Sequence, residues 1–265
     1  CMAQEQGKAA LLVKKFPFID IIFGTHNVAE LPDLIARKRR EKKVVSLLED
    51  RAETEDGAQA FRTSYPNAWV NITYGCNNFC TYCIVPYVRG REKSRSKDRI
   101  LEEVRALVAA GYKEITLLGQ NVNSYRDGDT DFPALLDAVA DVEGKFRVRF
   151  MTSHPKDFSA ELVAVMKKHD KVCNLVHLPA QSGSSRILSL MNRRYTREQY
   201  LDKVALLRRE IPDAEITTDL IVGFPTETEE EFEETLSLVK EADFSAAFTF
   251  IYSPRTGTKA AEMEG

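Results

Sequence analysis

The sequence predicts an α/β fold in which six strand-and-helix units form an open partial barrel, (β/α)6, preceded by the end of a smaller α/β unit. From residue 69 onward, short β-branched or aromatic runs alternate with amphipathic helical stretches. This alternation is typical of parallel strands joined by helical crossovers. The length agrees, because 69–252 is close to the roughly 190 residues that six units need at about 31 each. Six strands are too few to close as eight do, so we expect a lateral opening.

Each element has its own signals in the sequence. A helix at 98–110 ends at Gly111, and a helix at 228–242 begins with Thr228 and Glu231 as a capping box. The inward face of the first helix is expected to hold Ile100, Val104, Leu107 and Val108, and that of the second Phe232, Leu236 and Val239. The expected strands are 69–74, 114–118, 147–151, 174–178, 215–222 and 246–252.

The first 64 residues read differently from the rest. A helix at 4–15, a strand at 19–23 and a helix at 28–36 form the carboxyl-terminal part of a small α/β domain covering residues 1–40. Residues 41–64 are polar and are expected to be a charged linker, and 65–265 to be the core domain. Because the chain starts at Cys1, we expect it to be a piece of a longer protein.

Polar residues follow every expected strand. Gly119-Gln120-Asn121 follows the second strand, Thr152-Ser153-His154 the third, and residues 179–184, with Gln181, the fourth. Barrel enzymes carry their chemistry at this carboxyl-terminal rim. Taken singly, each motif could be an ordinary turn, and His177 alone is more typical of a satisfied core histidine. Together on one rim they predict a pocket.

Three cysteines, Cys76, Cys80 and Cys83, form a C-x3-C-x2-C pattern directly after the first strand. Three thiolates can hold three irons of a 4Fe-4S cube, which leaves the fourth iron open to a substrate or cofactor. A zinc site would need a fourth ligand, but Cys173 and the four histidines are scattered. Five cysteines are too few, and odd in number, for a disulfide framework. Cys173 is expected to be a small buried hydrophobe.

Charge is unevenly distributed along a chain whose net charge is −3. Residues 37–43 sum to +5 and residues 89–99 to +4. A basic run is often only a solvated face, but the second run follows the cysteines and would rim the opening, where it could contact RNA phosphates. The expected RNA contacts are Arg89, Arg91, Lys93, Arg95 and Lys97. The sequence has neither a signal peptide nor a long apolar span, so we expect a cytoplasmic protein with no membrane partner.

The cysteine loop, with Tyr82 before its last cysteine, resembles that of radical S-adenosylmethionine (SAM) enzymes. Residues 74–91, 119–125, 177–184 and 24–27 resemble the methylthiotransferase family within them, closest to its members that modify tRNA. The resemblance implies a partial TIM-like radical-SAM barrel, a 4Fe-4S cluster on Cys76, Cys80 and Cys83, and SAM bound at its open iron. On the expected rim, the SAM contacts would be the backbone of Tyr82 and the side chains of Gln120, Asn121, Ser153 and Gln181.

The same resemblance implies a reaction and its partners. The family's tRNA enzymes methylthiolate C2 of N6-isopentenyladenosine in the anticodon stem-loop, with SAM serving as methyl donor and as source of the 5′-deoxyadenosyl radical. Electrons would come from a reductase such as flavodoxin or ferredoxin. Cys1, in the context Cys1-Met2-Ala3-Gln4, would be one ligand of a second, auxiliary 4Fe-4S cluster, whose other ligands this sequence lacks. Thr226 departs from the family, where a glycine follows Gly-Phe-Pro.

Two other functions stay open at this stage. A relative within the family could act on threonylcarbamoyladenosine or on a ribosomal protein. Alternatively, the chain could be a non-enzymatic iron-sulfur or zinc module that binds RNA through its basic run. Cleavage of SAM under a strong reductant distinguishes the enzyme from the binding module.

Overall fold

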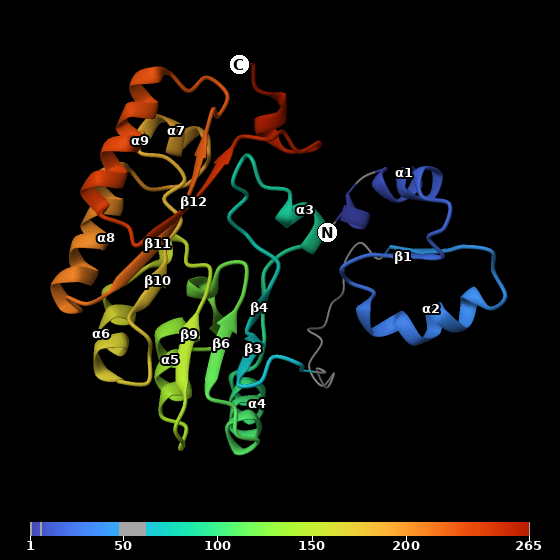
Figure 1. Ribbon diagram of the computed structural model, residues 1–265, viewed down its shortest axis with the longest axis horizontal. Coiled ribbons are helices and arrows are strands. Elements are labelled where there is room, and N and C mark those ends of the chain that lie inside the picture. Colours follow the sequence, from blue (N-terminus) through green and yellow to red (C-terminus); the bar gives the residue numbers. More distant parts are fainter. Residues whose placement is uncertain (1, 6, 48–61, 265) are drawn as a thin grey trace.

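The computed structural model describes residues 2–5, 7–47 and 62–264, with a small amino-terminal unit beside a larger barrel-like part (Figure 1). Two parallel three-stranded sheets form the larger part. Their orders are β3-β6-β9 and β10-β11-β12. The strands are β3 (Asn67–Asn71), β6 (Glu114–Leu118), β9 (Arg147–Phe150), β10 (Leu175–His177), β11 (Glu215–Val222) and β12 (Ala246–Ile251).

The two sheets continue into one another. Val148 of β9 bridges Val172 in parallel, and the Cys173 amide donates to the Val148 carbonyl at 2.9 Å, just before β10 begins. Within the described residues, β3 and β12 are not paired with each other. The predicted open arrangement of six parallel strands is therefore confirmed, with ends within two residues of those expected for every strand but the first.

Helices cover the outer face of this curved sheet (Figure 1). Successive strand residues alternate between faces, so Ile115 and Leu117 are fully buried toward the helices. Ile100, Val104 and Leu107 are buried as predicted, and each contributes about 1.5–3 kcal/mol through burial. The helices are α4 (Lys97–Ala109), α5 (Phe132–Ala140), α6 (Ala160–Lys168), α7 (Ser185–Leu190), α8 (Arg197–Glu210) and α9 (Glu229–Ala242).

Helix α9 has the predicted capping box but not the predicted inward face. The Thr228 hydroxyl accepts from the Glu231 amide, and the Glu231 carboxylate accepts from the Thr228 amide. The expectation was wrong for Leu236, which is 38% exposed, and for Phe232, which is only partly buried, whereas Val239 packs against the core as expected. The buried face consists of Glu231, Thr235, Leu238 and Ala242.

Polar partners in the loop before α7 explain that rotation of α9. The Thr235 hydroxyl accepts from the Gly183 amide at 2.8 Å, and the Glu231 carboxylate accepts from Ser184 and Arg186. The hydrogen bond from Arg186 lowers the pKa of Glu231 to about 2. Buried backbone and hydroxyl groups need hydrogen-bond partners. Glu231 and Thr235 therefore face the interior, although the apolar pattern of the helix predicts a different inward face.

The first predicted strand, 69–74, is split. After β3 comes β4 (Thr73–Tyr74), which pairs antiparallel with β5 (Lys93–Ser94) and encloses the cysteine loop and α3 (Val85–Arg89). A small hairpin, β7 (Arg126–Asp127) and β8 (Thr130–Asp131), precedes α5. Short 3-10 turns complete the larger part, at η3 (Val122–Ser124), η4 (Pro155–Asp157) and η5 (Lys259–Glu262). No helix among the described residues is long and apolar enough to cross a membrane.

The amino-terminal unit contains one more strand than predicted. Its elements are η1 (Met2–Gln4), α1 (Lys8–Lys15), β1 (Ile21–Phe23), η2 (Val28–Glu30), α2 (Leu31–Lys38) and β2 (Val44–Ser46). Strand β2 pairs in parallel with β1, and Val44 is only 1% exposed. The prediction of a charged linker over 41–64 is therefore wrong at 44–46, which form β2. Residues 48–61 lie outside the described residues. The Thr25 hydroxyl donates to the Val88 carbonyl of α3 at 2.6 Å, which ties the two parts together.

Thr226 has a left-handed backbone, with φ of 68°, which explains why a glycine suits this position. Arg186 donates to its carbonyl at 2.6 Å and to its hydroxyl at 3.3 Å. The left-handed conformation costs an ordinary residue roughly 1–2 kcal/mol. We therefore expect Thr226→Gly to raise the free energy of unfolding by about 1 kcal/mol in chemical denaturation. Thr228→Ala, which removes the cap of α9, should lower it by about the same amount. A less stable Thr226→Gly variant would contradict the explanation.

Candidate active site

The cysteine loop, residues 75–84, is held between strand β4 and the segment after α7. The Thr81 amide and hydroxyl donate to the carbonyls of Met191 and Leu190, at 3.1 and 2.9 Å. The Asn192 side chain donates to two more carbonyls of the loop, at 3.0 and 3.1 Å. Gly75, with φ of 71°, has no room for a side chain, because a Cβ would lie 2.2 Å from the Arg91 carbonyl. The loop is thus fixed from both sides.

The three thiols of this loop suit a cluster better than a single metal ion. Cys76 and Cys80 are buried, Cys83 is partly buried, and none is in a disulfide. Their sulfurs do not all lie within 4.8 Å of one another, whereas ligands 2.3 Å from one zinc ion would. Burial raises the pKa of Cys76, and raises that of Cys83 to about 11. These thiols therefore need a strongly positive partner before they ionise.

Arg193 is a buried cation aimed at this loop, and sequence reasoning missed it. Its side chain is 5% exposed, and its Nη1 donates to the Cys80 sulfur at 3.4 Å. Its other donors bind the Tyr195 hydroxyl at 3.0 Å and the Pro179 carbonyl at 2.9 Å. No Asp or Glu in the described ranges forms an ion pair with it. A buried charge without a counter-charge is strongly unfavourable, so anionic sulfur ligands at Cys80 would supply the missing partner.

Unpartnered polar atoms gather after the strands that carry the cysteine loop and its neighbours. Each of these atoms is buried without a hydrogen-bond partner among the described residues, which is uncommon in folded proteins and calls for an explanation such as a bound ligand. They include Thr73 Oγ1, Gln120 Oε1, Ser153 Oγ, His154 Nε2 and the Tyr252 hydroxyl. All five follow carboxyl-terminal ends of barrel strands, where the sequence predicts a pocket.

The residues expected to contact SAM do not all have free side-chain atoms. Gln120 and Ser153 do, and Gln181 is buried with φ of 72°, bridged to Leu220 of β11. Asn121 instead uses both polar atoms inside the protein, donating to Asp157 at 2.6 Å and accepting from the His154 amide at 3.1 Å. Its side chain positions the loop after β9.

Tyr82 lies at the edge of a second, small hydrophobic cluster near the cysteines. It packs against a core formed by Ile187, Met191, Phe224 and Ala260. Burial raises the pKa of its hydroxyl, so the side chain stays neutral. This apolar cluster can exclude water from one side of the cysteine loop.

His154 is held neutral inside the rim. Burial, with the nearby charges of Arg193 and Lys156, lowers its pKa to about 2. Because the histidine ionises near pH 6.5 in the unfolded chain, protons favour unfolding below that pH, and the contribution of neutral His154 to stability is full only above it. We expect the free energy of unfolding to fall between pH 7 and pH 5 by about 2 kcal/mol more in the wild type than in His154→Gln. Equal losses in denaturation curves at both pH values would contradict this assignment.

The basic run after the cysteines divides into exposed and buried members. Arg91 is exposed and lies over the Phe79 ring, 4.7 Å from its centre. Arg89, Lys93 and Lys97 are partly exposed. The expectation for Arg95 requires correction, because it is 8% exposed and pairs with Glu103 at 2.8 Å while donating to the Asn71 carbonyl. It is a structural residue beneath the loop.

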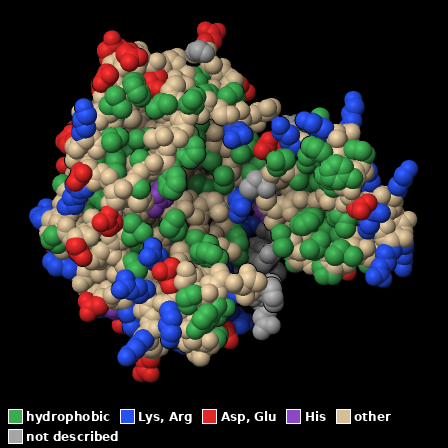
Figure 2. Space-filling view, in the orientation of Figure 1, with side chains coloured by type: hydrophobic (Ala, Val, Ile, Leu, Met, Phe, Trp, Pro, Cys, Tyr) green, Lys and Arg blue, Asp and Glu red, His purple; other side chains and the backbone are tan. Residues whose placement is uncertain are grey.

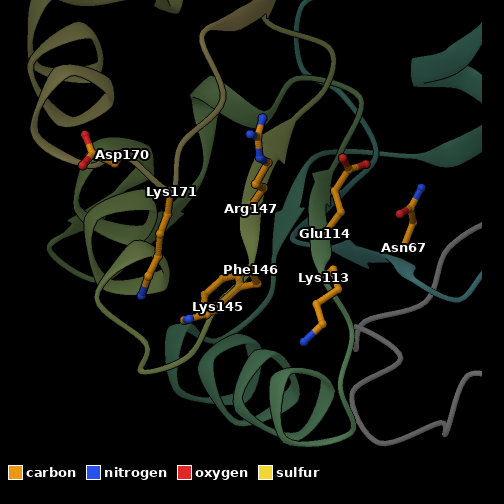
Figure 3. A pocket seen from close by; sticks show the side chains of 8 residues that line it. All are labelled: Asn67, Lys113, Glu114, Lys145, Phe146, Arg147, Asp170 and Lys171. Carbon is orange, nitrogen blue, oxygen red and sulfur yellow. The ribbon is translucent and has the colours of Figure 1, made fainter.

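Other charged groups of the described residues gather at three places outside the barrel rim. In the earlier basic run, Arg37 pairs with Glu41, and Lys38 with Asp20. A pocket of about 530 Å³ at the amino-terminal ends of β3, β6 and β9 includes Lys113, Lys145 and Arg147, whose side chains point in different directions (Figure 3). Asp137, Asp141 and His169 approach one another at the surface, but Lys168 already pairs with Asp137 at 2.7 Å.

Comparison with known proteins decides the family. The sequence profile described as "Radical SAM superfamily" matches residues 70–239, which include the cysteine loop and most of the barrel. The chain belongs to the radical SAM superfamily. A solved structure of a radical SAM methyltransferase, TsrM from Kitasatospora setae, aligns with a TM-score of 0.62 at 18% identity, covering 73% of this chain and 38% of that one. This similarity confirms the radical-SAM type of partial barrel.

Curated relatives are much more similar in sequence than that structure. The chain is 54% identical over 268 residues to a tRNA-2-methylthio-N(6)-dimethylallyladenosine synthase of Clostridium tetani, with 100% of this chain and 59% of the relative covered. It is 55% identical to the enzyme of the same name from Clostridium perfringens, with 100% and 60% covered. The resemblance to methylthiotransferases is thus confirmed, and the chain spans about 60% of the length of these relatives.

Proposed function

We propose that this chain carries the radical-generating part of an enzyme that methylthiolates C2 of N6-isopentenyladenosine in the anticodon stem-loop of tRNA. The observation that carries the proposal is the cysteine trio Cys76, Cys80 and Cys83, in which Cys80 accepts a hydrogen bond from the buried cation Arg193, on the rim of a barrel whose relatives bear that activity in their names. Residues 65–265 would form the catalytic core, and residues 1–40 the end of a neighbouring domain.

In this proposal, the three thiolates hold a 4Fe-4S cluster, and the orphaned polar groups of the rim seat SAM. Gln120 and Ser153 supply the unpartnered oxygens, and Gln181, in the segment after β10, is bridged to Leu220 of β11. When bound, cluster and SAM supply a 5′-deoxyadenosyl radical, which suits an aromatic C–H bond that a general base cannot deprotonate. The apolar surroundings of Tyr82 would keep water away from this reactive species.

The substrate and partners belong to the same proposal. RNA phosphates would be guided by Arg89, Arg91, Lys93 and Lys97. Arg95 is instead buried and pairs with Glu103. A reductase such as flavodoxin or ferredoxin would supply electrons in the cytoplasm. Cys1, the expected ligand of an auxiliary cluster, lies outside the described residues; one thiolate cannot hold such a cluster, so completing sulfur insertion needs ligands from elsewhere.

Nucleoside analysis tests the proposed function and separates it from its relatives. Deleting the gene should remove 2-methylthio-N6-isopentenyladenosine from digested tRNA and leave N6-isopentenyladenosine, as measured by liquid chromatography and mass spectrometry. Loss of the methylthio group from threonylcarbamoyladenosine or from a ribosomal-protein aspartate would instead support the alternative substrates. An unchanged pattern of all three would contradict a methylthiotransferase.

A further inference from the structure

The concave face of the barrel carries a histidine and a carboxylate side by side. His177 of β10 and Asp219 of β11 lie with Nε2 and Oδ2 3.4 Å apart. The Thr217 hydroxyl lies 3.0 Å from His177 Nδ1, and in the tautomer to which this hydroxyl donates, the histidine proton is on Nε2. The pair therefore presents one N–H donor next to carboxylate acceptors, on the face opposite the helices.

Aromatic side chains border this pair on the neighbouring strand. Phe248 of β12 is in register with Asp219, and its ring centre lies 6.5 Å from that of His177. Phe250 is two residues further on and shares its face. Although both are large and apolar, they are 60% and 54% exposed. Hydrophobic side chains are visible across the middle of the barrel part (Figure 2). Exposed aromatic rings beside a hydrogen-bonding pair are typical of sites that stack bases.

Backbone hydrogen bonds connect the pair to the candidate active site. The Asp219 carbonyl accepts from the Gln181 amide at 2.8 Å, and the His177 carbonyl accepts from the Ser153 amide at 3.3 Å. Both donors belong to the proposed SAM-binding rim. His177 and Asp219 are therefore hydrogen-bonded directly to that rim through their backbones.

We propose that His177 and Asp219 read the N7 and N6 edge of the target adenine while Phe248 stacks on its ring. This inference rests on the proposed function and deepens it. Adenine presents an acceptor at N7 and a donor at N6–H, and a singly alkylated N6 keeps one N–H. His177 Nε2–H matches the first group, and the Asp219 carboxylate the second. C2 lies on the other side of the six-membered ring, so a base held in this way leaves C2 free of both residues.

This arrangement also explains a choice between purines. Hypoxanthine and guanine carry an oxygen at position 6, which would face the Asp219 carboxylate and repel it. A well-matched pair of hydrogen bonds discriminates against the wrong base by about tenfold or more. The two residues thus favour adenine over 6-oxopurines, whereas the exposed phenylalanine, which can stack on any base, adds affinity without selectivity.

Binding of two RNAs to the reconstituted protein tests this inference. The probes are fluorescent anticodon stem-loops that carry either adenosine or inosine at the target position. The wild type should bind the adenosine RNA about tenfold more tightly. Asp219→Asn should bring the ratio close to one, because an amide can accept from N6–H or donate to O6. Asp213→Asn removes the same charge near the other end of β11, where the Asp213 carboxylate accepts from the Asn174 side chain, and should keep the wild-type ratio.

A second pair of variants tests the stacking role. Phe248→Ala should weaken binding of both RNAs about tenfold, and Ile251→Ala, on the opposite face of the same strand and 81% exposed, should change neither. An unchanged preference in Asp219→Asn, or equal effects of the two β12 variants, would overturn the inference. Binding of RNA without purine preference in the wild type would overturn it too, while leaving the proposed function intact. No RNA binding at all would overturn the proposed substrate class itself.

Discussion

Cys80→Ala should abolish the iron-sulfur cluster while leaving the fold intact. After anaerobic reconstitution, the wild type should hold close to four irons and the variant almost none at the same protein concentration, because two thiolates cannot keep an open-site cube in place. Iron and sulfide analysis with the visible absorption spectrum measures this. The substitution removes one buried sulfur, so the folded barrel should persist in circular dichroism.

Cys173→Ala is the matched control for this prediction. Cys173 is also a free, partly buried thiol, but it lies just before strand β10, where its backbone amide donates to the Val148 carbonyl. Its removal should not change the iron content. Four irons and an unchanged spectrum in Cys80→Ala would show that the cysteine loop is not the cluster site.

Replacing Arg193 with methionine should make the cluster harder to reduce. Arg193 is a buried positive charge whose Nη1 lies 3.4 Å from the Cys80 sulfur, and hydrogen bonds and charge near the sulfurs set the potential of such clusters. A unit charge roughly 5 Å away, at an effective dielectric constant of about 20, corresponds to a shift on the order of 100 mV toward more negative potential. Methionine preserves most of the side-chain volume, so the shift reports on charge and hydrogen bonding.

Two further variants separate charge from packing in that experiment. Arg193→Lys keeps the charge and should recover most of the wild-type potential, and Arg194→Met removes a charge from the exposed neighbouring side chain and should shift it little. The potential is measured by a redox titration followed by electron paramagnetic resonance. A potential in Arg193→Met within about 20 mV of the wild type would contradict the assigned role.

Most of the strand framework could be predicted from the sequence, because period-two and period-3.6 patterns depend on local burial. The strands at 114–118 and 215–222 have the predicted bounds. Helix α9 shows the limit of such patterns. Its rotation depends on hydrogen bonds that Thr235 and Glu231 accept from a loop some 50 residues earlier in the chain, and no local pattern encodes them. Strand β2 was missed for a related reason, since three residues inside a charged segment are too few for a periodic signal.

The candidate site was only partly predictable. Cysteine spacing indicated the cluster loop, because three ligands lie close together in the chain. Arg193 contacts Cys80 across 113 residues of sequence, and no local feature of the run Asn192-Arg193-Arg194 distinguishes the buried arginine from its exposed neighbour. The prediction for Arg95 was wrong because this arginine was expected at the surface and is buried. A basic run in the sequence does not show whether each member faces solvent or an internal carboxylate such as Glu103.

Transfer of deuterium from the substrate tests the central claim most directly. The reconstituted protein is incubated with SAM, a strong reductant and an anticodon stem-loop whose N6-isopentenyladenosine carries deuterium at C2. Mass spectrometry should find 5′-deoxyadenosine enriched in one deuterium, and Cys80→Ala should form no 5′-deoxyadenosine. If the protein bound the RNA and cleaved SAM but the 5′-deoxyadenosine contained no deuterium, hydrogen abstraction from C2 by this chain would be contradicted.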